Sequence, residues 1–192
     1  MNPVKLITPS TLEVVTLSEA KTHLKVTGTD EDTLIDTYLK AAIQRVENYR
    51  QAPIMSSEWE LYSSTFAYNV NLQKHPVSAI NSVKYYDENN DQQTINASNY
   101  RLHDFRVPCR LEFDAGYNFP NLYDREYPVV INFQAGFTYS ASASYQNIKH
   151  IVMATLGTHN EIRQMEMTGI GLAGVKLSQV SMEILDTETM WL

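Results

Sequence analysis

A long amphipathic stretch near the start of the chain constrains the fold more than any other feature. A short helix, an acidic turn and a long helix are predicted between residues 16 and 52. Thr16 and Glu19 have the spacing of a capping box, which satisfies free amides at a helix start. Either Thr29 or Asp30 is expected to cap the longer helix. The apolar residues of that helix recur at helical spacing and form one stripe, comprising Leu34, Ile35, Tyr38, Leu39, Ala42, Ile43, Val46 and Tyr49.

A second amphipathic helix is predicted over residues 145–165. One face carries its apolar and weakly polar residues, namely Ile148, Ile151, Val152, Thr155, Leu156, His159 and Ile162. An apolar helical stripe is normally buried against another element. We therefore expect the two long helices to pack against each other.

The region between these helices, residues 54–137, has the composition of β-strands. Its runs are rich in Val, Ile, Tyr, Phe and Trp, and several alternate apolar with polar residues. One hairpin is expected to pair the strand of Ile80, Val83 and Tyr85 with Thr94 and Ile95. One-sided faces are predicted for two later strands, at Leu111 and Phe113 and at Val129, Ile131 and Phe133.

These patterns predict an α+β fold with a helical core and an antiparallel β-rich insertion between the long helices. The helical core would comprise the short helix, the long helix and the C-terminal long helix. We interpret residues 1–192 as a single domain. Residues 1–15 should form an extended N-terminal arm, in which LEVV is a candidate strand, and residues 166–192 a flexible tail.

Composition limits the classes of function. The net charge of −7 and the pI near 5.2 argue against a protein that grips nucleic acid by its phosphates. Cys109 is the single cysteine, so an intrachain disulfide is excluded and a reducing compartment is expected. No apolar run approaches the roughly 20 residues that span a bilayer, and no signal peptide is apparent. We expect synthesis in the cytoplasm and no membrane partner.

No motif nominates a catalytic, metal or cofactor site. Asp87, Asn89 and Asp91 match the opening of a calcium loop, but Gln92 and Ser98 stand where a Gly and a Glu are needed. The glycines of GIGLAG do not follow a strand, as a dinucleotide-binding loop requires. The five histidines show no zinc spacing. The sequence therefore predicts a protein that is not an enzyme and needs no cofactor.

Two segments are candidates for contact surfaces. The alternative for the first is an ordinary loop, and the alternative for Trp191 and Leu192 at the end of the second is that they fold back onto the core. Aromatic residues are enriched in protein interfaces. The loop 116–128 offers Tyr117, Phe119, Leu122, Tyr123 and Tyr127. The tail offers Ile170, Leu172, Val175, Leu177, Met190, Trp191 and Leu192.

Several segments, in this order, resemble the head-tail connector, or adaptor, proteins of tailed bacteriophages and prophages. The first is LSEAKTHLKV, followed by the acidic turn TDED and a long helix that ends in RVENYRQAPI. HPVSAINSVKYYDENN resembles the strand that opens the inserted β region of the longer members. VVINFQAGF and the helix with IKHIVMATLGTHNEIR resemble their last strand and third helix.

This resemblance implies a structural virion protein at the head-tail junction, made in the host bacterial cytoplasm. Such proteins form a ring, commonly of about twelve copies, beneath the portal protein. The ring extends the DNA channel, lets DNA pass without specific binding, and offers a platform to the next tail-completion or stopper protein.

Other interpretations stay open from the sequence. A stopper or tail-terminator protein would also be mixed α and β and form rings, although the order helix–helix–sheet–helix favours the connector. A small enzyme or a ligand-binding module is a further alternative, and it would require a polar constellation that the sequence does not show.

Overall fold

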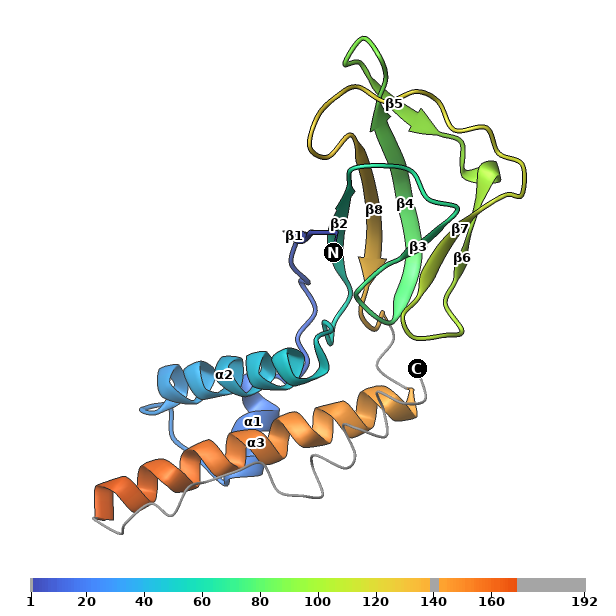
Figure 1. Cartoon of the computed structure of the whole chain (residues 1–192). Coiled ribbons are helices and arrows are strands. Elements are labelled where there is room, and N and C mark those ends of the chain that lie inside the picture. Colours follow the sequence, from blue (N-terminus) through green and yellow to red (C-terminus); the bar gives the residue numbers. More distant parts are fainter. Residues whose placement is uncertain (1, 139–141, 169–192) are drawn as a thin grey trace. The chain divides into compact units, whose positions relative to one another are not determined.

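The computed structural model describes residues 2–138 and 142–168, in which the predicted helices are present (Figure 1). They are α1 (Leu17–Leu24), α2 (Asp32–Arg50) and α3 (Ala143–Thr168). Contacts between residues divide the chain into two compact units, which are described separately below.

The start of α1 is the predicted capping box. The amide of Glu19 donates a hydrogen bond to Thr16 Oγ1 at 3.2 Å, and the amide of Thr16 donates to Glu19 Oε2 at 2.9 Å. Helix α2 begins at Asp32 with Glu31 as its N-cap, so the expected cap at Thr29 or Asp30 is wrong. The reason is a backbone turn, in which the Asp32 amide donates to the Thr29 carbonyl at 3.2 Å and so delays the helix.

The helical unit comprises residues 13–54 and 142–168 of the described chain. Helix α2 packs against α3, and α1 contacts both, which confirms the expected packing of the two long helices. The buried face of α2 is formed by Ile35, Leu39, Ala42 and Val46, and that of α3 by Tyr145, Ile148, Ile151, Val152, Thr155 and Leu156. Tyr49, at the margin of the α2 stripe, is 38% exposed.

The β unit comprises residues 2–12 and 55–138. Its larger sheet has five antiparallel strands in the order β1-β2-β8-β4-β5. Their bounds are Val4–Thr8 for β1, Ser57–Ser63 for β2, Val129–Ala135 for β8, Val77–Tyr86 for β4 and Gln92–Ile95 for β5. The predicted hairpin is confirmed, because Val83 of β4 faces Ile95 of β5.

The smaller sheet has three antiparallel strands in the order β3-β7-β6. Strand β3 spans Asn69–Asn71, β7 spans Arg110–Phe113, and β6 spans Tyr100–His103 after the short 3-10 helix η1 (Ala97–Asn99). Asn96 begins η1 by accepting a hydrogen bond from the Ser98 amide at 2.9 Å.

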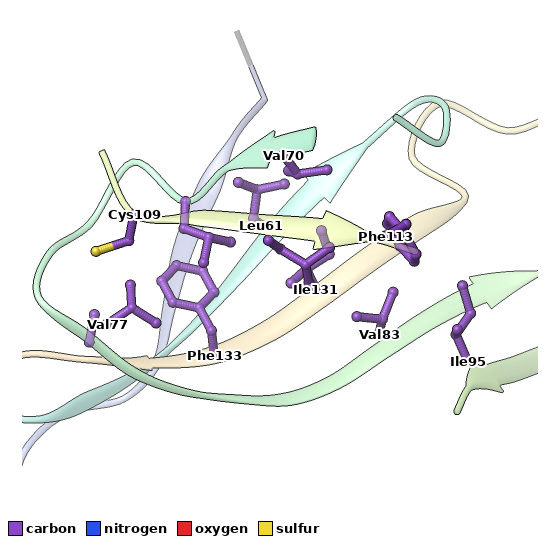
Figure 2. Packing of buried hydrophobic residues seen from close by; sticks show 12 residues of the cluster. Leu61, Val70, Val77, Val83, Ile95, Cys109, Phe113, Ile131 and Phe133 are labelled. Carbon is purple, nitrogen blue, oxygen red and sulfur yellow. The ribbon is translucent and has the colours of Figure 1, made fainter. Parts of the chain in front are cut away.

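One hydrophobic core is shared by the two sheets, as Figure 2 shows. The predicted one-sided faces of β7 and β8 meet there, with Phe113 from the small sheet and Ile131 and Phe133 from the large sheet. Further members of the core are Leu61, Val70, Leu72, Val77, Val83, Ile95, Cys109, Leu111 and Ala135. Alternation of apolar and polar residues thus builds a two-layer β structure within this unit.

The N-terminal arm differs from the prediction in one respect. Residues 12–15, LEVV, are not a strand, and the strand is β1, earlier in the arm. Val14 and Val15 are both buried in the helical unit, where the Tyr145 hydroxyl donates to the Val14 carbonyl at 2.9 Å. Adjacent residues of a one-sided strand point to opposite faces, so this double burial does not suit a strand.

The predicted fold class is confirmed. In the described residues, the β-rich region lies between the helices in sequence, and all of its strand pairs are antiparallel.

Candidate assembly surfaces

The predicted aromatic loop, residues 116–128, is less exposed than its composition suggests. Phe119 stacks on Phe66 with ring centroids 4.8 Å apart, and Tyr117 stacks on Phe113 at 5.8 Å. Both loop residues are partly buried against the core of the β unit. Their position is explained by internal packing, which leaves them less area to offer to another protein.

The remaining candidates of this loop lie further along it. Tyr123 is 41% exposed, whereas Leu122 and Tyr127 are half-buried. The loop is anchored to the end of β4, because the Tyr123 amide donates to the Tyr86 carbonyl at 3.0 Å. Asn121 Nδ2 also donates to Glu88 Oε1 at 2.6 Å.

Tyr127 lines a surface pocket of about 320 Å³, here called the tyrosine pocket, whose other lining residues are Tyr62, Tyr86, Arg125, Glu126 and Val130. The rings of Tyr62 and Tyr127 meet edge to face at 6.3 Å. The guanidinium carbon of Arg125 lies 3.9 Å from the centroid of the Tyr86 ring, within the range of a cation–π contact. The pocket therefore combines aromatic walls with one charge of each sign, on Arg125 and Glu126.

Two phenols of this pocket are held in the neutral form. The Tyr62 hydroxyl donates to Glu60 Oε2 at 2.5 Å, and this hydrogen bond, more than burial, raises the pKa of Tyr62 to about 12. A hydrogen bond to Glu126 likewise raises the pKa of Tyr127. At neutral pH neither Tyr62 nor Tyr127 therefore carries a phenolate charge.

A second exposed feature is the loop 104–108 between β6 and β7, here called the Phe105 loop. Phe105 is 78% exposed, more than any other large hydrophobic side chain in the described part of the chain. Its neighbours Asp104 and Arg106 are also exposed. The base of the loop is fixed, because the Leu72 amide donates to the Cys109 carbonyl at 2.9 Å.

The edge strand β1 is a third exposed feature. Leu6 is 42% and Ile7 39% exposed, and the register of β1 on β2 shifts between Leu6 and Thr8. The strand is held by side chains, since Glu58 accepts from Thr8 Oγ1 at 2.7 Å and from Asn132 Nδ2 at 2.9 Å. Asn132 in turn accepts from Asn81 Nδ2 at 2.7 Å. A series of side-chain hydrogen bonds, here called the polar chain, therefore crosses β1, β2, β8 and β4.

The tail candidates lie outside the described residues. They are Ile170, Leu172, Val175, Leu177, Met190, Trp191 and Leu192. The flexible tail predicted over residues 166–192 begins inside α3, which ends at Thr168. The rest of the predicted tail, residues 169–192, lies outside the described residues.

The described residues contain no group of three or more His, Cys, Asp or Glu arranged to hold a metal ion. Asp87 instead organises the β4–β5 turn, because its carboxylate accepts from the amides of Asn89 and Asp91, both at 3.0 Å. His159 of α3 stacks on Tyr38 of α2 at 6.1 Å, and burial, together with the charge of Arg45, lowers its pKa. Cys109 is buried, and burial raises the pKa of its thiol.

Across residues 2–138 and 142–168, no helix combines the length and apolarity that crossing a membrane requires.

Sequence reasoning missed the Phe105 loop and most of the tyrosine pocket. Phe105 sits in a short polar turn, DFRVP, where a lone aromatic carries no periodic signal. Tyr62, Tyr86 and Arg125 are distant in sequence and meet only through strand register, in which Tyr62 faces Val130.

The fold and these surfaces define a class: a mixed α+β protein with exposed aromatic and apolar side chains and, in its described part, no group of residues arranged to hold a metal ion. Residues 14–105 match the model of the phage gp6-like head-tail connector protein family. This match confirms the resemblance to the head-tail connector family over these residues. None of the curated proteins compared matches the chain significantly.

Solved structures with a similar fold come from gene transfer agent (GTA) particles. A chain of the virion of the native GTA particle has a TM-score of 0.74 and 20% identity, with 98% of this chain and 95% of that chain covered. A chain of the neck of the native particle, computed with C12 symmetry, has a TM-score of 0.74 and 19% identity over the same shares. A chain of the neck of the empty particle, computed with C6 symmetry, has a TM-score of 0.71 and 20% identity. At these identities the likeness establishes the fold.

Proposed function

We propose that this chain is a structural virion protein, a head-tail connector that joins the head to the tail. The observation that carries the proposal is the family match over residues 14–105. The shared fold with chains of GTA particle necks supports it over both units, because the similarity covers 98% of the chain. Both units would then act together as one connector subunit, which is located in the virion and is not an enzyme.

The connector would work as a ring of about twelve copies beneath the portal. The structures with a similar fold belong to necks computed with C12 and C6 symmetry. A closed ring requires two different patches on each subunit that fit each other. The β unit offers several exposed patches that suit this requirement, among them the tyrosine pocket, which includes Tyr127, and the Phe105 loop.

The portal protein above the ring and the next tail-completion or stopper protein below it are the remaining partners. We assign the apolar residues of the tail, from Ile170 to Leu192, to docking on the portal. Leu122 and Tyr123 of the aromatic loop are assigned to contact with a neighbouring subunit or the tail side. Deleting residues 169–192 tests the first assignment, because attachment to portal-bearing heads should then be lost.

DNA would pass through the channel of the ring without specific binding. The net charge of −7 supports this, because a channel wall of negative charge repels phosphates. Tight DNA binding by the assembled ring at moderate salt would contradict it.

Joining of heads and tails in a lysate tests the connector function directly. The reading frame of this chain is interrupted in a genome that encodes it, and particles are produced from that genome. The resulting lysate is examined by electron microscopy. DNA-filled heads and separate tails are expected, and the purified full chain should restore joined particles. Joined particles in the lysate without the chain would overturn the proposal.

A further inference from the structure

The exposed tip of the Phe105 loop, formed by Asp104, Phe105 and Arg106, is here called the knob. Phe105 is 78% exposed at the tip, with a negative side chain before it, Asp104, and a positive one after it, Arg106. In the described part of the chain neither of these two charged side chains takes part in an ion pair. The loop ends at Cys109, which belongs to the buried core, so the knob stands on a fixed base.

The tyrosine pocket has the size and the chemistry to receive such a knob. A cavity of about 150 Å³ already accepts benzene, and this pocket measures about 320 Å³. Three of its six lining residues are Tyr62, Tyr86 and Tyr127. Edge-to-face and stacked contacts between aromatic rings are favourable beyond their buried area.

The charges of the two features are complementary. The knob has Asp104 before Phe105 and Arg106 after it in sequence, both exposed, and the pocket is lined by Arg125 and Glu126. Opposite charges meet at both positions when Asp104 pairs with Arg125 and Arg106 pairs with Glu126. The reverse pairing places like charges together. Charge patterns of this kind select the orientation of a complex.

We propose that Phe105 of one copy of this chain inserts into the tyrosine pocket of the next copy, with Asp104 beside Arg125 and Arg106 beside Glu126. Knob and pocket are different patches on the same unit, so the contact is heterologous. Repetition of a heterologous contact generates a ring when the rotation between copies closes, as the proposed function requires. Opposite charges at the contact also offset the repulsion between copies that each carry a net charge of −7. The inference rests on the proposed function, because it requires that copies of this chain build a ring.

Sedimentation velocity of the purified full chain, over concentrations up to the millimolar range, tests the contact. We expect Phe105→Ser, Arg106→Glu and Glu126→Arg each to weaken self-association about tenfold or more, as truncation or reversal at the centre of an interface does. The double variant with Arg106→Glu and Glu126→Arg should recover association to within about threefold of the unmodified chain, because it restores opposite charges.

Two matched variants control for general effects. Asp124→Arg changes charge as Glu126→Arg does, on an exposed side chain that does not line the pocket. Leu12→Ser removes an apolar side chain that is 52% exposed, in the same unit but outside the contact. Both should associate like the unmodified chain, and circular dichroism should show every variant folded.

Three results would overturn the contact. They are single variants that associate like the unmodified chain, a double variant no better than the single ones, or an unmodified chain that stays monomeric throughout. Each would leave the connector function standing if the purified chain still joins heads to tails. Loss of that joining activity would instead refute the function, whichever residues hold the copies together.

Discussion

Lys149 of α3 donates a hydrogen bond to Glu19 of α1, with 2.6 Å between Nζ and Oε1. The same carboxylate accepts from the backbone amide of Thr16 at 2.9 Å, so it both caps α1 and ties α1 to α3. The bond to Lys149, and then the bond to Thr16, hold the pKa of Glu19 below its ordinary value of 4.5. One residue therefore links the capping box seen in the sequence to the packing of the helical unit.

Replacement of this carboxylate should destabilise the helical unit. For Glu19→Gln we expect a loss of about 0.5 kcal/mol in the free energy of unfolding, mainly from the lost charge opposite Lys149. The loss is small because Gln can still accept from the Thr16 amide and because solvent screens a salt bridge whose Glu side chain is 45% exposed. Chemical denaturation at neutral pH measures this loss. The exposed Glu13→Gln is the control and should change stability little.

The pH dependence of that loss has a definite sign. Since folding lowers the pKa of Glu19, its stabilisation is present above the ordinary value of 4.5 and is lost as the pH falls through the folded-state pKa. The stability difference between the unmodified chain and Glu19→Gln should therefore shrink in acid. A difference that grows toward low pH would contradict the assigned role.

Gly136 should not tolerate a side chain. Its φ of +108° disfavours any L residue, and an added Cβ would come within 2.3 Å of the Met55 carbonyl oxygen. We expect Gly136→Ala to cost about 3 kcal/mol or more, because positive φ alone costs about 1–2 kcal/mol and the backbone must also move. Gly116→Ala is the matched control, with a φ of +86° and nothing within 4 Å. Equal urea midpoints for the two variants would contradict the close approach.

The two parts of the aromatic loop should respond differently to substitution. Phe119→Ala should lower stability by about 2–3 kcal/mol, since the ring packs on Phe66 and Phe113 but is only partly buried. Tyr123→Ser should leave thermal stability nearly unchanged, because Tyr123 is exposed and its anchoring bond comes from its backbone. If Tyr123→Ser unfolded the protein, the loop would have a structural role that these contacts do not explain.

The polar chain through Glu58 should hold the edge strand β1 in place. The hydrogen bonds from Thr8 and then Asn132 lower the pKa of Glu58. Glu58→Gln replaces one acceptor oxygen by a donor, so one of these bonds is lost. Hydrogen exchange should become faster for the amides of β1, with the helical unit as an internal reference. Unchanged exchange in β1 would show that the backbone ladder alone holds the strand.

Much of the fold could be predicted because its cause is local. The spacing of Ile35, Leu39, Ala42 and Val46 already marks the buried face of α2, and Thr16 with Glu19 marks a helix start. The partial burial of Tyr117 and Phe119 could not be predicted in this way. The turn-rich composition indicates a loop, but only the folded sheets bring Phe66 and Phe113 within reach of its rings.

The tyrosine pocket and the Phe105 loop were harder to predict for the same reason. Tyr127 was named from its loop, but the pocket around it needs Tyr62 and Tyr86 from β2 and β4, which strand order brings to either side of β8. Phe105 belongs to no periodic pattern of apolar residues, and only its exposed fraction of 78% distinguishes it from a core residue.

Cryo-electron microscopy of the neck of particles made by a genome that encodes this chain tests the account most directly. The account predicts a closed ring of about twelve copies between the portal and the tail, each with the β unit and the helical unit described above. A neck ring built from a different protein, with this chain absent from the head-tail junction, would contradict it.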